Sequence, residues 1–205
     1  MSDPKKMVLE VGLVDFFRQE VVQARGELGL KMSEGTEFYL VNLLVEFGHH
    51  GDTRVGSPGS EPLALQYKRA LDAELAERLI LLKALADSSL YVAGFFTDRI
   101  DATAVDVSYY ITMGGHAYQE LAGLMGQRRQ GATFAKLYGH LAHKFTDWVD
   151  VLNQISERSR SQTDRDVDLL KLYDRWVRTG SQRLRRQLHA HGLLTAEGLP
   201  TEYAQ

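Results

Sequence analysis

Apolar residues recur at helical spacing along almost the whole chain, and this period constrains the fold more than any other feature of the sequence. Leu137, Leu141, Trp148 and Leu152, for example, follow one another at intervals of four or seven residues, which places them on one face of a helix. Strict alternation of apolar and polar residues over strand-like lengths is hard to find. The 205 residues include only four prolines, and proline is the residue that most strongly interrupts a helix. The sequence therefore predicts an all-α fold.

About seven helices are expected from these apolar stripes and from residues that favour helix ends. Ser33 precedes one stripe as a preferred N-cap residue, and Asp87 or Ser88 has the same position before another. The expected helices cover residues 8–28, 33–47, 62–86, 88–99, 105–125, 132–155 and 164–189. The Gly-, Ser- and Pro-rich residues 48–61 predict a flexible loop, and residues 193–205 predict a frayed C-terminal tail.

A single domain is expected, with residues 36–47 as its central helix. A length of 205 residues with 44% hydrophobic content suffices for one core, so we expect one helical bundle over residues 1–205. Residues 36–47 are apolar almost all round the helix, which is typical of a helix covered by its neighbours. Polar residues on such a helix are of interest, because a buried carboxylate must be paired, protonated or bound to something.

Polar side chains on that helix and on residues 105–125 form a candidate metal site. Glu46 and His49 have the Glu-x-x-His spacing that places a carboxylate and an imidazole on one helix face, as in di-iron bundles. His116 and Glu120 share one side of the later helix, and such ligands suit iron, manganese or zinc. Di-iron bundles need a second Glu-x-x-His pair, which this sequence lacks. The favoured alternative is that Glu46 pairs with an arginine or a tyrosine hydroxyl while His49 is solvated.

Aromatic residues and glycines are concentrated between Tyr91 and Leu121, and this density has two interpretations. One is a ligand pocket. Its candidate lining residues are Asn42, Tyr91, Phe95, Phe96, Tyr109 and Tyr110. The other, which we favour, is close helix packing, because Gly94 and the pair Gly114 and Gly115 lie beside large side chains and small residues let helix backbones approach.

A basic face on residues 164–189 is the clearest candidate for binding a partner. Its members cluster within about 100° on the side opposite the apolar stripe. They are Lys171, Arg175, Arg178, Arg185, Arg186 and His189. Such a face can meet an acidic protein, nucleic-acid phosphates or a lipid headgroup. The alternative is a solvated face whose acidic start and basic end complement the helix dipole. Aromatic residues are not interleaved on it, so nucleic acid is not favoured.

Composition excludes several classes of protein. The chain has no cysteine, which excludes disulfides and thiolate catalysis and suits a reducing compartment. A net charge of −3 and a pI near 6.2 argue against a surface that is basic throughout. No uncharged apolar run reaches the roughly eighteen residues that a membrane span needs. We also find no Gly-rich phosphate loop and no serine nucleophile elbow.

Three stretches resemble a family of uncharacterised all-α bacterial proteins. They are LYVAGFFTDRI, VDVSYYITMGGHAY and DLLKLYDRWVRTGSQRL. The resemblance extends over about residues 79–188. It implies one domain and a bacterial source, and it assigns no function.

The leading hypothesis is a non-enzymatic helical protein of the bacterial cytoplasm that binds a partner protein or itself, with the basic face as a possible contact. A complete catalytic constellation is missing from the sequence, which is the main argument for it. No cofactor is expected under this hypothesis. One alternative is a metal- or cofactor-dependent oxidoreductase that uses the Glu/His site. A second is a regulator that binds a small molecule in the aromatic pocket.

Overall fold

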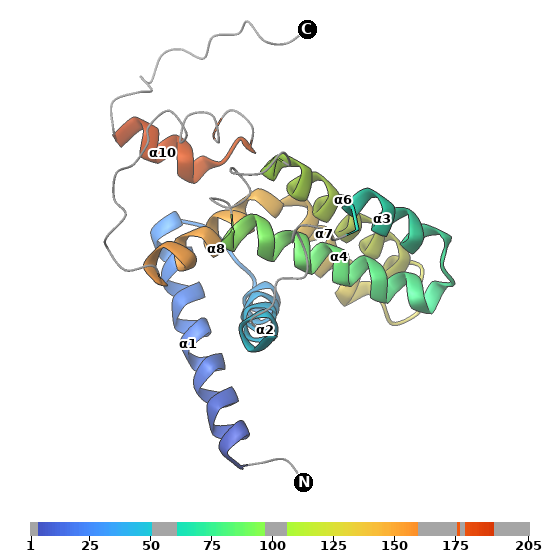
Figure 1. Ribbon diagram of the computed structural model, residues 1–205, viewed down its shortest axis with the longest axis horizontal. Helices are drawn as coiled ribbons and strands as arrows, with labels where there is room; N and C mark the ends of the chain where they lie inside the picture. The colour runs from blue at the N-terminus through green and yellow to red at the C-terminus, as the bar shows by residue number, and fades with distance from the viewer. Residues whose placement is uncertain (1–3, 51–60, 97–105, 160–175, 177–178, 191–205) are drawn as a thin grey trace, which may run out of the picture. The chain divides into compact units, whose positions relative to one another are not determined.

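The computed structural model describes residues 4–50, 61–96, 106–159, 176 and 179–190. The chain divides into two compact units, residues 1–160 and 161–205, which are described separately. The first contains α1 (Pro4–Leu28), α2 (Glu34–His50), α3 (Leu63–Asp72), α4 (Leu75–Phe95), α6 (Val107–Gly126), α7 (Ala132–His143) and α8 (Phe145–Ser159) (Figure 1). The second contains α10 (Gln182–Ala190). Every regular element in the described part of the chain is helical, which confirms the all-α fold. The single domain over residues 1–205 stays a prediction.

The structure confirms the predicted Ser33 cap of α2, which follows a tight corner after α1. Gly29 follows α1 with a φ of 67°, a conformation that glycine adopts without steric cost. Ser33 then starts α2, and its Oγ accepts a hydrogen bond from the backbone N–H of Thr36 at 3.2 Å. Arg18 and Arg25 of α1 both pair with Glu37 in the first turn of α2. The corner is therefore fixed by one glycine, one cap and a shared carboxylate.

Two helix boundaries differ from the sequence prediction on either side of α4. The helix expected over residues 62–86 is interrupted, because Ala73 and Glu74 have extended backbone conformations between α3 and α4. The cap expected at Asp87 or Ser88 is wrong, since α4 continues through both to Phe95. Ser88 satisfies its hydroxyl within the helix by donating to the Ala84 carbonyl at 2.6 Å. Asp87 has partners from other helices, so tertiary contacts override its preference for a helix start.

Two further boundaries also differ. The helix expected over residues 132–155 is two helices, because Lys144 leaves helical geometry between α7 and α8. The apolar stripe runs through this break, which is why the periodicity does not reveal it. The loop expected over residues 48–61 begins later than predicted, since α2 extends to His50. Residues 51–60 and the expected tail at 193–205 lie outside the described residues.

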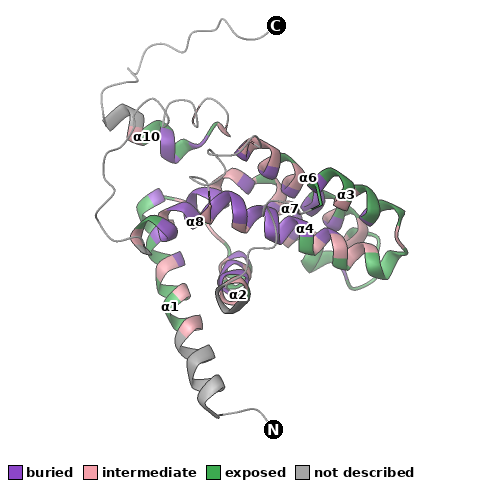
Figure 2. Ribbon diagram, in the orientation of Figure 1, coloured by how far each residue is buried: buried purple, intermediate pink, exposed green. Residues whose placement is uncertain are grey.

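The central helix of the first unit is α4, which corrects the prediction for residues 36–47. α4 packs against α2, α3, α6 and α8, and residues 85–90 are all buried, so every side of the helix is covered there (Figure 2). α2 is covered on one side only. Leu40, Val41, Leu43 and Leu44 are buried, whereas Phe38, Asn42 and Glu46 are exposed.

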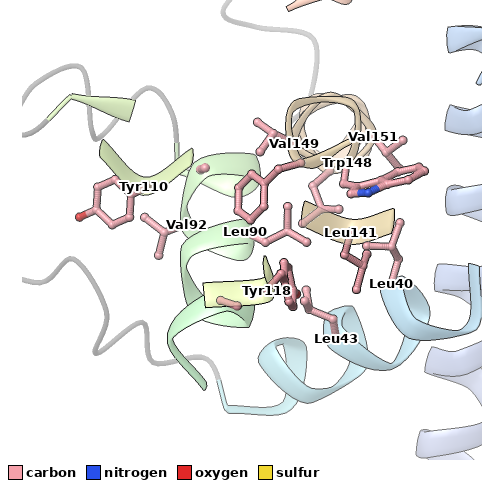
Figure 3. Close-up of a cluster of buried hydrophobic side chains, with 14 of the residues drawn as sticks. Leu40, Leu43, Leu90, Val92, Tyr110, Tyr118, Leu141, Trp148, Val149 and Val151 are labelled. Atoms are coloured by element: carbon pink, nitrogen blue, oxygen red, sulfur yellow. The ribbon is translucent and has the colours of Figure 1, made fainter. Parts of the chain in front are cut away.

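The core joins the helices around α4 through large apolar side chains. Figure 3 shows Leu40 and Leu43 of α2, Leu90 of α4, Tyr118 of α6 and Trp148 of α8 converging on one cluster. Leu40, Leu90, Tyr118 and Trp148 are fully buried. A buried side chain of this size contributes on the order of 1.5–3 kcal/mol to the free energy of unfolding. The close packing favoured from the sequence is present at two glycines: Gly94 lies against Leu152 of α8, and Gly114 lies against Phe145.

Candidate functional site

The carboxylate of Asp87 is a buried polar group with three side-chain partners from three helices. Its side chain is 7% exposed in the middle of α4. Oδ1 accepts hydrogen bonds from the hydroxyl groups of Tyr39 at 2.5 Å and Tyr118 at 2.7 Å. Oδ2 accepts one from Nζ of Lys83, one turn earlier on α4, at 2.5 Å. The buried charge is therefore paired with a cation and bound by two neutral donors, which is what burial of a carboxylate requires.

Three tyrosine rings surround this carboxylate. The ring centroids of Tyr39 and Tyr138 are 6.0 Å apart, those of Tyr118 and Tyr138 are 6.0 Å apart, and those of Tyr39 and Tyr118 are 6.1 Å apart. Nζ of Lys83 lies 5.6 Å from the Tyr39 ring centroid, within reach of a cation–π interaction. Because the rings come from α2, α6 and α7, this Asp87 cluster (Tyr39, Lys83, Asp87, Tyr118 and Tyr138) joins those helices to α4.

Burial and nearby charges together raise the pKa values of Tyr39, Tyr118 and Lys83. Burial, and then the neighbouring Asp87 carboxylate, raise the pKa of Tyr39 and of Tyr118 well above the ordinary tyrosine value. Burial alone would lower the pKa of Lys83, but the charges of Asp87 and Glu46 outweigh it, so that pKa is raised. At neutral pH both hydroxyls therefore remain donors and Lys83 remains a cation. The cluster is a fixed hydrogen-bonded junction with one ammonium group at its edge.

Two exposed phenylalanines are neighbours of these tyrosines: one contacts a tyrosine ring, and the other is adjacent to a tyrosine in the sequence. The Phe134 ring stacks on Tyr138 with centroids 6.4 Å apart, and Phe134 is 52% exposed. Phe38, next to Tyr39 on α2, is 63% exposed. The two helices make contact where Oγ1 of Thr36 in α2 lies within hydrogen-bonding distance of the His140 ring in α7. We call the exposed faces of α2 and α7 that carry Phe38 and Phe134 the aromatic surface.

His140 connects the start of α2 to α7. Its Nδ1 lies 3.2 Å from Oγ1 of the fully buried Thr36, which is in turn 2.9 Å from Oγ of Ser33. The imidazole also meets the Trp148 ring edge-on, with centroids 5.3 Å apart. Burial, followed by the charges of Lys144 and His143, lowers the pKa of His140, and Asp147 opposes this only weakly. The folded protein therefore favours the neutral imidazole.

A pH-dependent loss of stability should follow from this histidine. Its folded-state pKa lies below the unfolded value of about 6.5, so the unfolded chain binds the proton more tightly. Neutral His140 therefore makes its full contribution to the free energy of unfolding when the pH is above the unfolded pKa. That contribution is lost as the pH falls from the unfolded pKa towards the folded pKa. In urea unfolding at about pH 7.5 and 5.5, wild type should lose more stability on acidification than His140→Gln. His116→Gln, which changes an exposed histidine, should behave as wild type. Equal losses for wild type and His140→Gln would contradict the assignment.

The structure does not group the described members of the predicted metal site, which are Glu46, His116 and Glu120. Glu46 is exposed on α2, and its charge helps to raise the pKa of Lys83. His116 and Glu120 are exposed on α6. Burial, and then the charge of Glu120, raise the pKa of Tyr67 in α3. The side chain of His49 lies outside the described residues. Within those residues, no three histidine, aspartate or glutamate side chains are placed to hold one metal ion. Iron, manganese or zinc binding stays a prediction.

The residues predicted to line one pocket make contacts in different parts of the first unit. Tyr91 stacks on Phe47 and Phe95 with centroids 4.4 and 5.0 Å apart, and Phe96 meets it edge-on at 5.7 Å. At another place, the Tyr109 ring meets the Tyr110 ring edge-on at 6.0 Å, and its hydroxyl accepts a hydrogen bond from the N–H of Ala64 at the start of α3. Asn42 is exposed and donates to the carbonyl of Phe38. These contacts give Tyr91 and Tyr109 packing roles, and the ligand pocket stays a prediction.

The predicted basic face is only partly within the described residues. Arg185 and Arg186 of α10 are exposed, whereas the two residues before them, Arg183 and Leu184, are buried. Lys171, Arg175 and Arg178, and the side chain of His189, lie outside the described residues. The exposure of the two arginines agrees with the predicted placement, and binding through this face stays a prediction.

The Asp87 cluster is not apparent from the sequence. One signal was present: Lys83 and Asp87 are four residues apart within an otherwise apolar run, the spacing at which a helix brings opposite charges together. Tyr39 and Tyr118 carry no comparable signal, because they lie 48 and 31 residues from Asp87 in the sequence. Only the packing of α2, α4 and α6 brings them to one carboxylate.

Comparisons with known proteins add no family assignment. No protein-family model matches the chain, and neither the curated proteins nor the solved structures gave a match. Among the helices in the described ranges, none has the length and apolar character needed to cross a bilayer. The function must therefore be argued from the residues themselves.

Proposed function

We propose that this is a non-enzymatic helical binding protein of the bacterial cytoplasm, and that it contacts its partner through the aromatic surface on α2 and α7. The observation that supports this most is the exposure of two phenylalanines, Phe38 at 63% and Phe134 at 52%. The cysteine-free composition suits the reducing compartment.

Exposed aromatic rings favour association more than scattered aliphatic residues do. Leu65, Leu75 and Ile80 are also exposed, but single apolar residues are normal on protein surfaces. Phenylalanine is enriched in the cores of interfaces, where a rigid ring buries a large area with little loss of rotamer freedom. Phe38 and Phe134 belong to helices that contact each other at Thr36 and His140, and we propose that one partner covers both rings.

The Asp87 cluster supports this proposal by holding the two helices in place. Tyr39 is next to Phe38 and donates to Asp87, while Tyr138 contacts both Tyr39 and Phe134. A surface fixed before binding loses less conformational entropy when a partner docks. The arrangement therefore links the buried Asp87 carboxylate to the helix positions of two phenylalanines that are exposed in the described part of the chain.

Site-specific photo-cross-linking in cells tests this proposal. A photoreactive benzophenone amino acid replaces Phe38 in one variant and Phe134 in another, and cell extracts are separated by mass after irradiation. We expect both variants to form a discrete adduct of the same mass, because one partner covers both positions.

A matched control is Leu65 on α3, whose 52% exposure equals that of Phe134. The benzophenone at this position should give no such adduct. Absence of adducts at positions 38 and 134, or an identical pattern at position 65, would refute the aromatic surface as the contact.

A further inference from the structure

The turn between α6 and α7 carries two exposed arginines, Arg128 and Arg129, that differ from the other arginines described in the first unit. Each of those others has a partner, which is a glutamate in four cases and a backbone carbonyl in one. They are Arg18, Arg25, Arg69, Arg158 and, bound to the carbonyl, Arg78. Arg128 and Arg129 take part in none of the ion pairs found within the described ranges. Their guanidinium groups are therefore available to a binding partner.

Positive charge dominates this part of the sequence. No aspartate or glutamate lies between Glu120 and Asp147, although this stretch includes the turn and all of α7. Its lysines and arginines are Arg128, Arg129, Lys136 and Lys144. Lys144 pairs with Asp147 at 3.3 Å. Because the whole chain has a net charge of −3, the positive charge at the turn is local and attracts acidic groups to that place.

Phe134 places an exposed ring at the same end of α7. It lies in the first turn of the helix, three residues after the N-cap Gly131. The turn before it is tightly packed, because a Cβ added at Gly131 would collide with the carbonyl oxygen of Met125. The backbone N–H of Gly131 also donates to the carbonyl of Arg128 at 3.0 Å. We call Arg128, Arg129 and Phe134 the basic end of α7, and its backbone is fixed before a partner binds.

A short acidic segment of a protein fits the basic end of α7 better than a nucleic acid or a lipid surface does. A guanidinium group can bind a carboxylate through two parallel hydrogen bonds. Arginine and phenylalanine are enriched in protein interfaces, whereas lysine is depleted there. Nucleic acids and anionic membranes gain their affinity from many phosphate contacts at once. The net charge of −3 opposes the approach of such a large polyanion.

We propose that the partner presents carboxylates beside an apolar side chain, and that this acidic segment docks on the basic end of α7. The inference rests on the proposed function, since it names the chemistry of the partner that covers Phe134. The carboxylates pair with Arg128 and Arg129, and the apolar side chain packs on the Phe134 ring. Ion pairs of this exposed kind determine which partner is selected more than how tightly it binds. Higher salt therefore weakens the complex.

NMR titration of the isotope-labelled full chain tests the acidic segment with defined probes. The main probe is a short synthetic peptide of glutamates around one phenylalanine, and the matched probe has glutamine in place of each glutamate. We expect the glutamate peptide to shift the backbone amide resonances of Arg128, Arg129 and Phe134. The glutamine peptide should bind about fivefold more weakly, because it cannot form the two exposed ion pairs.

Charge reversal at the turn gives the decisive variant. Arg128→Glu combined with Arg129→Glu should weaken binding of the glutamate peptide at least about tenfold, because attraction becomes repulsion. The matched control is Lys31→Glu combined with Lys68→Glu, which reverses two exposed charges elsewhere and should change the affinity less than about twofold. Circular dichroism confirms that each variant is folded. Equal affinity for the two peptides, or equal effects of the two double variants, would overturn the inference. Tighter binding of an oligouridylate or of phosphatidylserine vesicles than of the glutamate peptide would also overturn it.

Photo-cross-linking at position 134 in the Arg128→Glu, Arg129→Glu background separates this inference from the proposed function. We expect the adduct to be lost in that background. An undiminished adduct would refute the acidic segment and leave the aromatic surface as a binding site. No adduct even with both arginines in place would refute the aromatic surface itself.

Discussion

Replacing Asp87 with alanine should destabilise the protein by about 2–4 kcal/mol, the largest effect expected from one polar side chain. The change leaves the hydroxyl groups of Tyr39 and Tyr118 without their acceptor. A buried donor left without a partner costs roughly 1–3 kcal/mol. Lys83 contributes less, because its side chain is 42% exposed and can return to water. Urea unfolding at neutral pH measures the loss.

Two further variants separate the Asp87 cluster from a general effect of removing charge. Asp87→Asn keeps the shape and one acceptor oxygen, so it should lose less stability than Asp87→Ala. Asp72→Ala removes an exposed carboxylate at the end of α3 and should change the free energy of unfolding by less than about 0.5 kcal/mol. If Asp87→Ala were as mild as Asp72→Ala, the cluster would not be the junction of α2, α4 and α6.

Gly114→Ala and Gly115→Ala should have opposite effects although the two residues are adjacent in α6. A Cβ added at Gly114 would lie 2.5 Å from Cζ of Phe145 and 2.8 Å from Cβ of Ser89. The Ser89 atom is attached directly to the backbone of α4, so α4 and α6 would have to separate. Overpacking of this kind costs typically 1–3 kcal/mol. A Cβ added at Gly115 would meet nothing within 4 Å, and alanine there should stabilise the helix by about 0.5–1 kcal/mol.

Thermal unfolding of the two glycine variants checks the close approach of α4 and α6. We expect the midpoint of Gly114→Ala to fall and that of Gly115→Ala to rise relative to wild type. A stabilising Gly114→Ala would mean that the helices are further apart than the structure has them. The sequence analysis treated the two glycines as one packing feature, and only the neighbouring helix distinguishes them.

Helical periodicity predicts the fold class because it reports which side of each segment is buried. It does not predict breaks through which the stripe continues, such as Lys144 between α7 and α8, or Ala73 and Glu74 between α3 and α4. It also selected the wrong central helix. Residues 36–47 are apolar almost all round the helix, yet Phe38 is exposed, whereas the central α4 buries the polar Asp87, Ser88 and Ser89. The apolar content of a segment therefore does not identify which helix is central.

The candidate site was less predictable than the fold, because it depends on contacts between distant segments. Asp87 directly follows the helix expected over residues 62–86, so its local sequence predicts an N-cap for the next helix. Its actual role requires hydroxyl groups from α2 and α6 and an ammonium group from its own helix. Likewise, nothing in the sequence separates the exposed Phe38 from its buried neighbours on α2. The local sequence pattern predicts which side of a helix is buried, but it does not predict which helices contact one another.

A spin label on α2 gives the most direct test of the aromatic surface. The chain has no cysteine, so Asn42→Cys and Gln119→Cys, both at exposed positions, each accept one nitroxide. When cell extract is added to each labelled protein, we predict that the spectrum of the α2 label becomes immobilised, because the partner covers that face, while the spectrum of the α6 label stays mobile. Unchanged mobility at position 42, or immobilisation at position 119 instead, would contradict binding through the aromatic surface of α2 and α7.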